Sequence, residues 1–187
     1  LTTGVNISLH AVQFINSNTG WIAGSNGKIK KSTNGGTSWF NQSINSSENL
    51  RRILMIDANT GFICGDSGKI LKTTNGGNDW NNTNASGFTE NIYAMDFINA
   101  STGICVNESR RQFITTNGGV NWISSNMNGV SPLLSIYGID MADSNTIYAG
   151  TGSGFLTSAK VYKSVNFGTS YTASLNEGSN FSSATIK

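Results

Sequence analysis

The sequence has little charge, one proline, two cysteines and no long hydrophobic segment. Charged residues make up 12% of the 187 residues, and 12 Lys+Arg against 10 Asp+Glu leave a net charge of +2. This balance argues against a nucleic-acid-binding protein, because such proteins concentrate basic side chains on one face. The lack of a helix-length apolar stretch excludes a transmembrane helix, so we expect no membrane insertion.

The two cysteines, Cys64 and Cys105, lie within apolar strand-like segments. We expect buried free thiols, because a free cysteine packs as a small hydrophobic residue. The polar residues are mainly Asn, Ser, Thr and Gly. Asn and Gly tolerate the positive φ of tight turns, so this composition indicates many short strands joined by turns. It also favours an extracytoplasmic location: secreted, periplasmic or on the cell surface.

A repeat of about 40 residues, a period typical of propellers and solenoids, runs through the chain. The segment STNGGTSW from Ser32 recurs as TTNGGNDW from Thr73, as TTNGGVNW from Thr115 and as SVNFGTSY from Ser164. The residues before each motif also align, and an extra loop, TGSGFLTS, lengthens the fourth copy. Four matches in register identify four structural units.

Each unit contains four short strand-like segments. In the first unit we predict strands over residues 9–15, 21–25, 29–33 and 38–42, with a tight Asn26-Gly27 turn between the second and third. Asn-Gly favours a hairpin turn in which both central residues have positive φ. Four strands per repeat predict an all-β protein, a β-propeller built of four-stranded antiparallel blades. The predicted blades cover about residues 9–43, 50–84, 91–126 and 133–175 of a single propeller segment, 1–187.

The repeated motif predicts a structural turn in every blade. Its Asn can cap the turn by bonding backbone N–H groups two residues on, and its second Gly occupies a place that a Cβ would block. The aromatic residue then begins the outer strand and packs against the neighbouring sheet. A calcium loop is the alternative, but the ligand positions lack carboxylates, so we expect no metal and no cofactor. The motif residues are Ser32, Asn34, Gly36, Trp39, Thr73, Asn75, Gly77, Trp80, Thr115, Asn117, Gly119, Trp122, Ser164, Asn166, Gly168 and Tyr171.

These copies resemble the Asp-box, or BNR, repeat from Leu9 to about Leu175. The phrase NTGWIAGSNGKIKKSTNGGTSW is similar to the photosystem II stability/assembly factor-like repeats, which are common in secreted and cell-surface bacterial propellers. The sequence has Asn where the family motif usually has Asp. The resemblance implies the fold but little about function, because Asp-box propellers include sialidases, xyloglucan hydrolases, sortilin-type receptors and assembly factors.

Two of the enzyme classes that share this repeat need particular catalytic or binding residues. A sialidase needs three arginines converging from different blades, which the adjacent pairs Arg51-Arg52 and Arg110-Arg111 do not supply. A xyloglucanase-like hydrolase needs two carboxylates about 5–10 Å apart across a cleft. Asp96 and Asp140 share one inner-strand position in adjacent blades and are the candidate catalytic pair. The alternative, which we favour, is that each caps or solvates a strand end.

A second set of equivalent positions lies near the start of each inner strand. His10, Arg51, Tyr93 and Tyr137 occupy one position, flanked by apolar residues, and Arg52 occupies the next in the second blade. These side chains are typical of interaction hot spots and sugar platforms. Ordinary packing between blades is the alternative. We predict a non-catalytic scaffold or recognition module that binds a protein partner or surface glycan at this rim, with a glycan-binding or glycoside hydrolase role as the alternative.

The ends of the sequence lead us to expect a piece of a longer chain or assembly. The sequence starts at Leu1 without an initiator Met or a charged-then-apolar leader, and Leu1 aligns with the end of an outer strand. Residues 181–187 align with the start of a fifth unit, so we expect 176–187 to begin a further blade or form a closing strand. A closed ring of four blades is the alternative.

Overall fold

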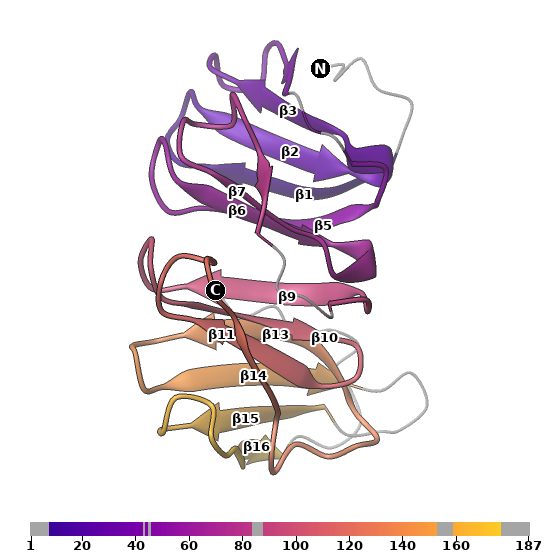
Figure 1. Cartoon of the computed structure of the whole chain (residues 1–187), viewed down its shortest axis with the longest axis vertical. Coiled ribbons are helices and arrows are strands. Elements are labelled where there is room, and N and C mark those ends of the chain that lie inside the picture. Colours follow the sequence, from indigo (N-terminus) through magenta and orange to yellow (C-terminus); the bar gives the residue numbers. More distant parts are fainter. Residues whose placement is uncertain (1–7, 43, 45, 84–87, 153–158, 177–187) are drawn as a thin grey trace. The chain divides into compact units, whose positions relative to one another are not determined.

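Sixteen short strands lie within the residues that the structure, a computed structural model, describes: 8–42, 44, 46–83, 88–152 and 159–176 (Figure 1). They form four four-stranded antiparallel sheets, one for each copy of the repeat, which we number blades 1 to 4. The predicted fold class is therefore confirmed. The chain divides into two compact units, residues 1–91 and 92–187, each with two blades. The predicted strand within 176–187 lies almost entirely outside the described residues.

The first unit holds blades 1 and 2, and in each blade the strands are hydrogen-bonded in chain order. Blade 1 comprises β1 (Leu9–Phe14), β2 (Gly20–Gly24), β3 (Ile29–Ser32) and β4 (Phe40–Asn41), with the 3₁₀ turn η1 (Ser25–Gly27). Blade 2 comprises β5 (Leu50–Met55), β6 (Gly61–Gly65), β7 (Ile70–Thr73) and β8 (Asn81–Asn82), with the 3₁₀ turn η2 (Asp66–Gly68).

The second unit holds blades 3 and 4 in the same strand order. Blade 3 comprises β9 (Ile92–Phe97), β10 (Gly103–Asn107), β11 (Arg111–Thr115) and β12 (Ile123–Asn126). Blade 4 comprises β13 (Ser135–Met141), β14 (Ile147–Gly152), β15 (Lys160–Ser164) and β16 (Thr172–Asn176). The extra loop of the fourth repeat falls mostly on residues 153–158, outside the described residues.

The hairpin turn predicted at Asn26-Gly27 has the expected backbone. Asn26 and Gly27 have φ of 56° and 63°, and the equivalent Ser67 and Gly68 have φ of 54° and 67°. The last strand of blade 1 is shorter than predicted, because the preceding turn extends to Ser38 and leaves β4 only two residues.

The Asp-box turn has the same hydrogen bonds in every blade. In blade 1 the Ser32 hydroxyl accepts the backbone N–H of Gly36 at 2.8 Å and donates to Asn34 Oδ1 at 3.0 Å. Asn34 Oδ1 also accepts the N–H of Ser38 at 2.9 Å. The prediction that Asn bonds N–H groups two residues on was wrong: it bonds the N–H four residues on, because the hydroxyl of the preceding Ser or Thr takes the nearer N–H groups. These bonds close the Asp-box turn within each blade.

Within each unit the two blades pack face to face. We call the face that packs on the preceding blade the leading face, and the face that packs on the following blade the trailing face. In the first unit Leu50, Ile53 and Met55 of β5 join Trp21 and Ala23 of blade 1 in one buried cluster. In the second unit the corresponding residues of β13 are clustered with apolar residues of β9 and β10; the β13 residues are Ile136, Ile139 and Met141.

The cysteines and three of the four motif aromatics are buried. Cys64 and Cys105 are buried and form no disulfide, as predicted, and burial raises the pKa of Cys64 to about 12. Trp80 is buried as expected, as are Trp122 and Tyr171, whereas Trp39 is only partly buried. Among the described residues there is no helix with the length and apolar character needed to cross a membrane.

Candidate functional site

The rim residues, which we define as His10, Arg51, Tyr93 and Tyr137, each lie at a β-bulge. In blade 1 Leu9 pairs with Gly24 and Ala11 pairs with Ala23, so His10 has no residue opposite it. The pairing of the inner two strands shifts at the same position in blades 2, 3 and 4. A bulge bends the strand and redirects a side chain, and such bulges are common next to functional sites. The four bulges set these side chains apart from the regular alternation of the strands.

Each rim residue contacts a residue at or just after the end of the second strand of its own blade. His10 Nε2 lies 3.0 Å from Ser25 Oγ, and the Arg51 side chain forms an ion pair with Asp66. The Tyr93 hydroxyl donates to Glu108 Oε2 at 3.3 Å.

Blade 4 makes the same contact with a glycine. A Cβ on Gly152 would lie 3.1 Å from the ring of Tyr137, so the ring covers the backbone there. Ser25, Asp66, Glu108 and Gly152 are equivalent in the repeat, yet sequence reasoning missed them. The alignment that identified the rim residues also aligns these four partners.

The rim side chains and the neighbouring Arg52 are partly accessible. His10 and Arg52 are exposed, Arg51 and Tyr93 are half-buried, and 40% of Tyr137 is exposed. Neither Tyr93 nor Tyr137 is fully buried, and ordinary packing between blades stays the alternative. In the first unit β1, which carries His10, packs on β5, which carries Arg51 and Arg52. In the second unit β9 and β13, which carry Tyr93 and Tyr137, pack on each other in the same way. The binding role of these residues stays a prediction.

The Asp-box turns lie at the other end of the blade from the rim. In blade 1 the N–H of Gly35 donates to Asn18 O, in the turn that follows the far end of β1. Equivalent bonds occur in the other three blades, from Gly76 to Asn59, from Gly118 to Ser101 and from Phe167 to Asn145. A ligand at the rim would therefore be remote from the Asp-box turn of the same blade.

Asp96, one of the two candidate catalytic carboxylates, makes a hydrogen bond between blades. Its Oδ2 accepts the backbone N–H of Met141 at 2.6 Å. The same position in blade 1 is Gln13, whose amide bonds the backbone N–H and C=O of Met55 in blade 2. An amide cannot exchange protons as an acid or base, so this recurring bond indicates a structural role. Asp140 is partly buried and close enough to Asp96 to influence its ionisation.

The pKa of Asp96 is raised, mainly by burial and further by the nearby Asp140, although N–H groups of Met141 and Phe97 partly oppose the shift. Because its pKa is raised in the folded state, Asp96 contributes to the stability of the fold below its unfolded pKa of about 3.9. This contribution is lost as the pH rises through the folded-state pKa.

The variant D96N keeps an oxygen acceptor for the N–H of Met141 but removes the carboxylate charge. We expect the stability of D96N minus that of the wild type to increase with pH across this range, as measured by urea unfolding. A difference that decreases with pH would contradict this account.

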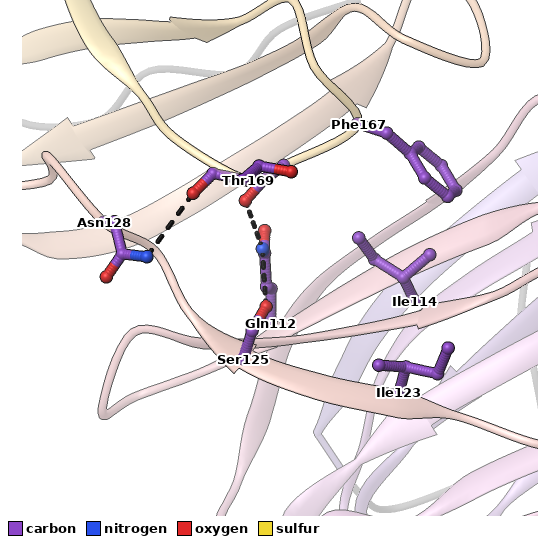
Figure 2. A pocket seen from close by; sticks show the side chains of 8 residues that line it. Gln112, Ile114, Ile123, Ser125, Asn128, Phe167 and Thr169 are labelled. Atoms are coloured by element: carbon purple, nitrogen blue, oxygen red, sulfur yellow. Dashed lines mark hydrogen bonds between the residues drawn. The ribbon is translucent and has the colours of Figure 1, made fainter.

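A groove of about 280 Å³ lies in the second unit, between the outer strands of blade 3 and the Asp-box turn of blade 4. Figure 2 shows Gln112 at its base and Ile114, Ile123 and Phe167 along one side. Buried Gln112 donates to Ser125 Oγ at 2.9 Å and to Gly168 O at 2.5 Å, and it accepts the Tyr171 hydroxyl at 2.7 Å. Its polar atoms therefore hold the two blades together. Sequence reasoning missed Gln112, because apolar residues occupy its position in the other repeats. The residues that line the groove do not include Asp96 or Asp140.

Comparisons with known proteins agree with this fold. Residues 2–87 match the family described as Photosynthesis system II assembly factor YCF48. No curated protein matches the sequence. Of the solved structures that are similar, YCF48 bound to D1 peptide is 12% identical with a TM-score of 0.61, over 94% of this chain and 84% of that chain.

Two further solved structures are similar in fold. YCF48 from Cyanidioschyzon merolae is 15% identical with a TM-score of 0.68, over 96% of this chain and 59% of that chain. An ancestral GH74 enzyme is 22% identical with a TM-score of 0.71, over 92% of this chain and 24% of that chain. The chain is thus a β-propeller chain built of BNR-type repeats, and it spans only part of these two proteins.

Proposed function

We propose that this chain is a non-catalytic β-propeller recognition module that binds a protein segment at the rim. The observation that carries the proposal is the bulge that recurs in all four blades at one repeat position. A bulge interrupts the hydrogen bonding between two paired strands. Its retention in four diverged copies of the repeat supports a binding role for the side chains that it redirects. Those side chains differ from blade to blade while the flanking residues stay apolar.

The chemistry of the rim suits a peptide better than a small substrate. Tyrosine supplies a large contact area at low conformational cost, and Tyr93 and Tyr137 stand on adjacent strands of the second unit. The Tyr93 hydroxyl is held by Glu108, and the Arg51 guanidinium is held by Asp66. Side chains oriented in this way lose less freedom when a partner binds. Arg52 adds an exposed cation beside Arg51.

The comparisons support a protein segment rather than a glycan as the partner. One solved structure of similar fold is YCF48 with a bound D1 peptide. The hydrolase alternative is weaker, because Asp96 is committed to the backbone of Met141. The extracytoplasmic location expected from composition belongs to this proposal and is tested by fractionating cells that produce the parent protein.

Selection from a phage-displayed peptide library tests the proposal. We expect the wild-type chain to enrich peptides whose affinity, measured by fluorescence anisotropy, falls at least about tenfold when Tyr93 and Tyr137 are both replaced by alanine. This loss corresponds to about 1.4 kcal/mol, the scale of an interface anchor. Circular dichroism should show an unchanged fold.

Thr74→Ala and Val120→Ala provide the matched controls, because both residues are exposed in Asp-box turns at the opposite end of their blades. We expect full affinity from both controls. Failure to enrich any peptide, or equal binding by the double rim variant, would reject the rim as a peptide site.

A further inference from the structure

The leading face of blade 1 exposes apolar side chains that are buried in other blades. Val12 is 66% exposed, and Leu9 and Phe14 are 44% and 41% exposed. The equivalent residues of β5 and β13 are at most 8% exposed, because each packs on the trailing face of the preceding blade in its own unit. The surface of β1 therefore has the composition of an interface between blades.

The pairing of blades 1 and 2 shows what such a leading face binds. Three side chains of the blade 1 trailing face bond the backbone of blade 2. Gln13 bonds the N–H and C=O of Met55, while Trp21 Nε1 and Lys31 Nζ donate to Gly76 O at 3.2 and 3.0 Å. Lys31 Nζ also lies 4.9 Å from the centre of the Trp21 ring. Gly76 belongs to the Asp-box turn of blade 2, so that turn is the polar part of the leading face.

Blade 4 carries equivalent groups on its own trailing face. Asp140, Tyr148 and Lys163 occupy the repeat positions of Gln13, Trp21 and Lys31, and all three are partly buried. Lys163 Nζ lies 5.5 Å from the centre of the Tyr148 ring, as Lys31 lies over Trp21. An aspartate at the Asp140 position can form the bond between blades, because Asp96 forms it in blade 3.

We propose that the leading face of blade 1 in one copy of this chain binds the trailing face of blade 4 in a second copy. By equivalence with the internal interfaces, the Asp140 carboxylate accepts the backbone N–H of Phe14, and the Lys163 ammonium donates to Gly35 O. Leu9, Val12 and Phe14 lose their exposed apolar surface, which stabilises the contact. The second copy is the occupant because one sequence supplies both halves of the interface, with the groups that join blades 1 and 2.

The oligomeric state of the purified chain tests this interface. We expect analytical ultracentrifugation to show that the wild type self-associates into dimers or larger head-to-tail assemblies, and that Val12→Asp raises the dissociation constant at least tenfold. Val120→Asp is the matched control: Val120 is 76% exposed, and blade 2 has the polar residue Asn78 at its position. This control should self-associate as the wild type does. A folded wild-type monomer, or equal dissociation of both variants, would overturn the proposal.

A mixing experiment separates this interface from any other self-association. Val12→Asp damages only the leading face, and Lys163→Glu damages only the trailing face, so each variant alone should be largely monomeric. An equimolar mixture keeps one intact pair of faces and should recover heterodimers, measured with one variant fluorescently labelled. Circular dichroism confirms that each variant is folded. Failure of the folded variants to associate when mixed would reject the head-to-tail pairing.

Discussion

Replacement of Trp80 by alanine is expected to lower the free energy of unfolding by roughly 3–5 kcal/mol, the usual range for the loss of a buried aromatic side chain. Trp80 is 7% exposed and belongs to the buried cluster that joins blades 1 and 2. Its indole lies against Gly77, where a Cβ would be only 3.1 Å from Trp80 Nε1. Deletion of the ring therefore leaves a cavity in the buried cluster between the two sheets. Urea unfolding followed by far-ultraviolet circular dichroism measures the loss.

Two variants show whether the loss comes from burial between blades. Trp39 occupies the same repeat position in blade 1 but is only partly buried, so Trp39→Ala should be clearly less destabilising. Trp80→Phe should retain most of the stability, because Trp80 Nε1 has no hydrogen-bond partner among the described residues. A loss below about 1 kcal/mol for Trp80→Ala would show that the ring does not anchor blade 2, since buried aromatic deletions cost more than this.

Gly129→Ala is expected to destabilise the second unit by roughly 2–5 kcal/mol, combining left-handed backbone strain with overpacking. Gly129 has φ of 94°, and a Cβ there would lie 2.0 Å from the backbone oxygen of Tyr171. The neighbouring Asn128 O accepts the N–H of Tyr171 at 2.7 Å, so the two backbones are held together at this point. A methyl group would force them apart and break a contact between blades 3 and 4. Thermal and urea unfolding both report the change.

Gly35→Ala separates the two causes. Gly35 also has positive φ, 66°, but its Cβ would meet only the backbone oxygen of Ser17, at 3.1 Å. We expect a loss of about 1–2 kcal/mol there, from the backbone conformation. If Gly129→Ala is no more harmful than Gly35→Ala, the close approach of Tyr171 is not a constraint on the fold.

Local chemistry made the blades predictable from the sequence. The Asp-box bonds join residues two to four positions apart, and the Asn26-Gly27 turn depends on two adjacent residues. Such contacts form from neighbouring residues whatever the rest of the chain does. The repeat register then identified equivalent positions, including those of the rim residues and of Asp96 and Asp140. The sequence could not show the bulges, because no residue type is specific to them in these blades.

Contacts between blades were decided only by the tertiary structure. Asp96 and Met141 are 45 residues apart, and Gln112 and Gly168 are 56 residues apart. A carboxylate that bonds a neighbouring blade and a carboxylate that lines a cleft look alike in sequence, since each is a polar residue in an apolar strand. The same limit applies to Trp39 and Trp80, which share a motif position but differ in burial. The sequence determines each blade because its bonds are local, whereas packing between blades determines which side chains remain available to a partner.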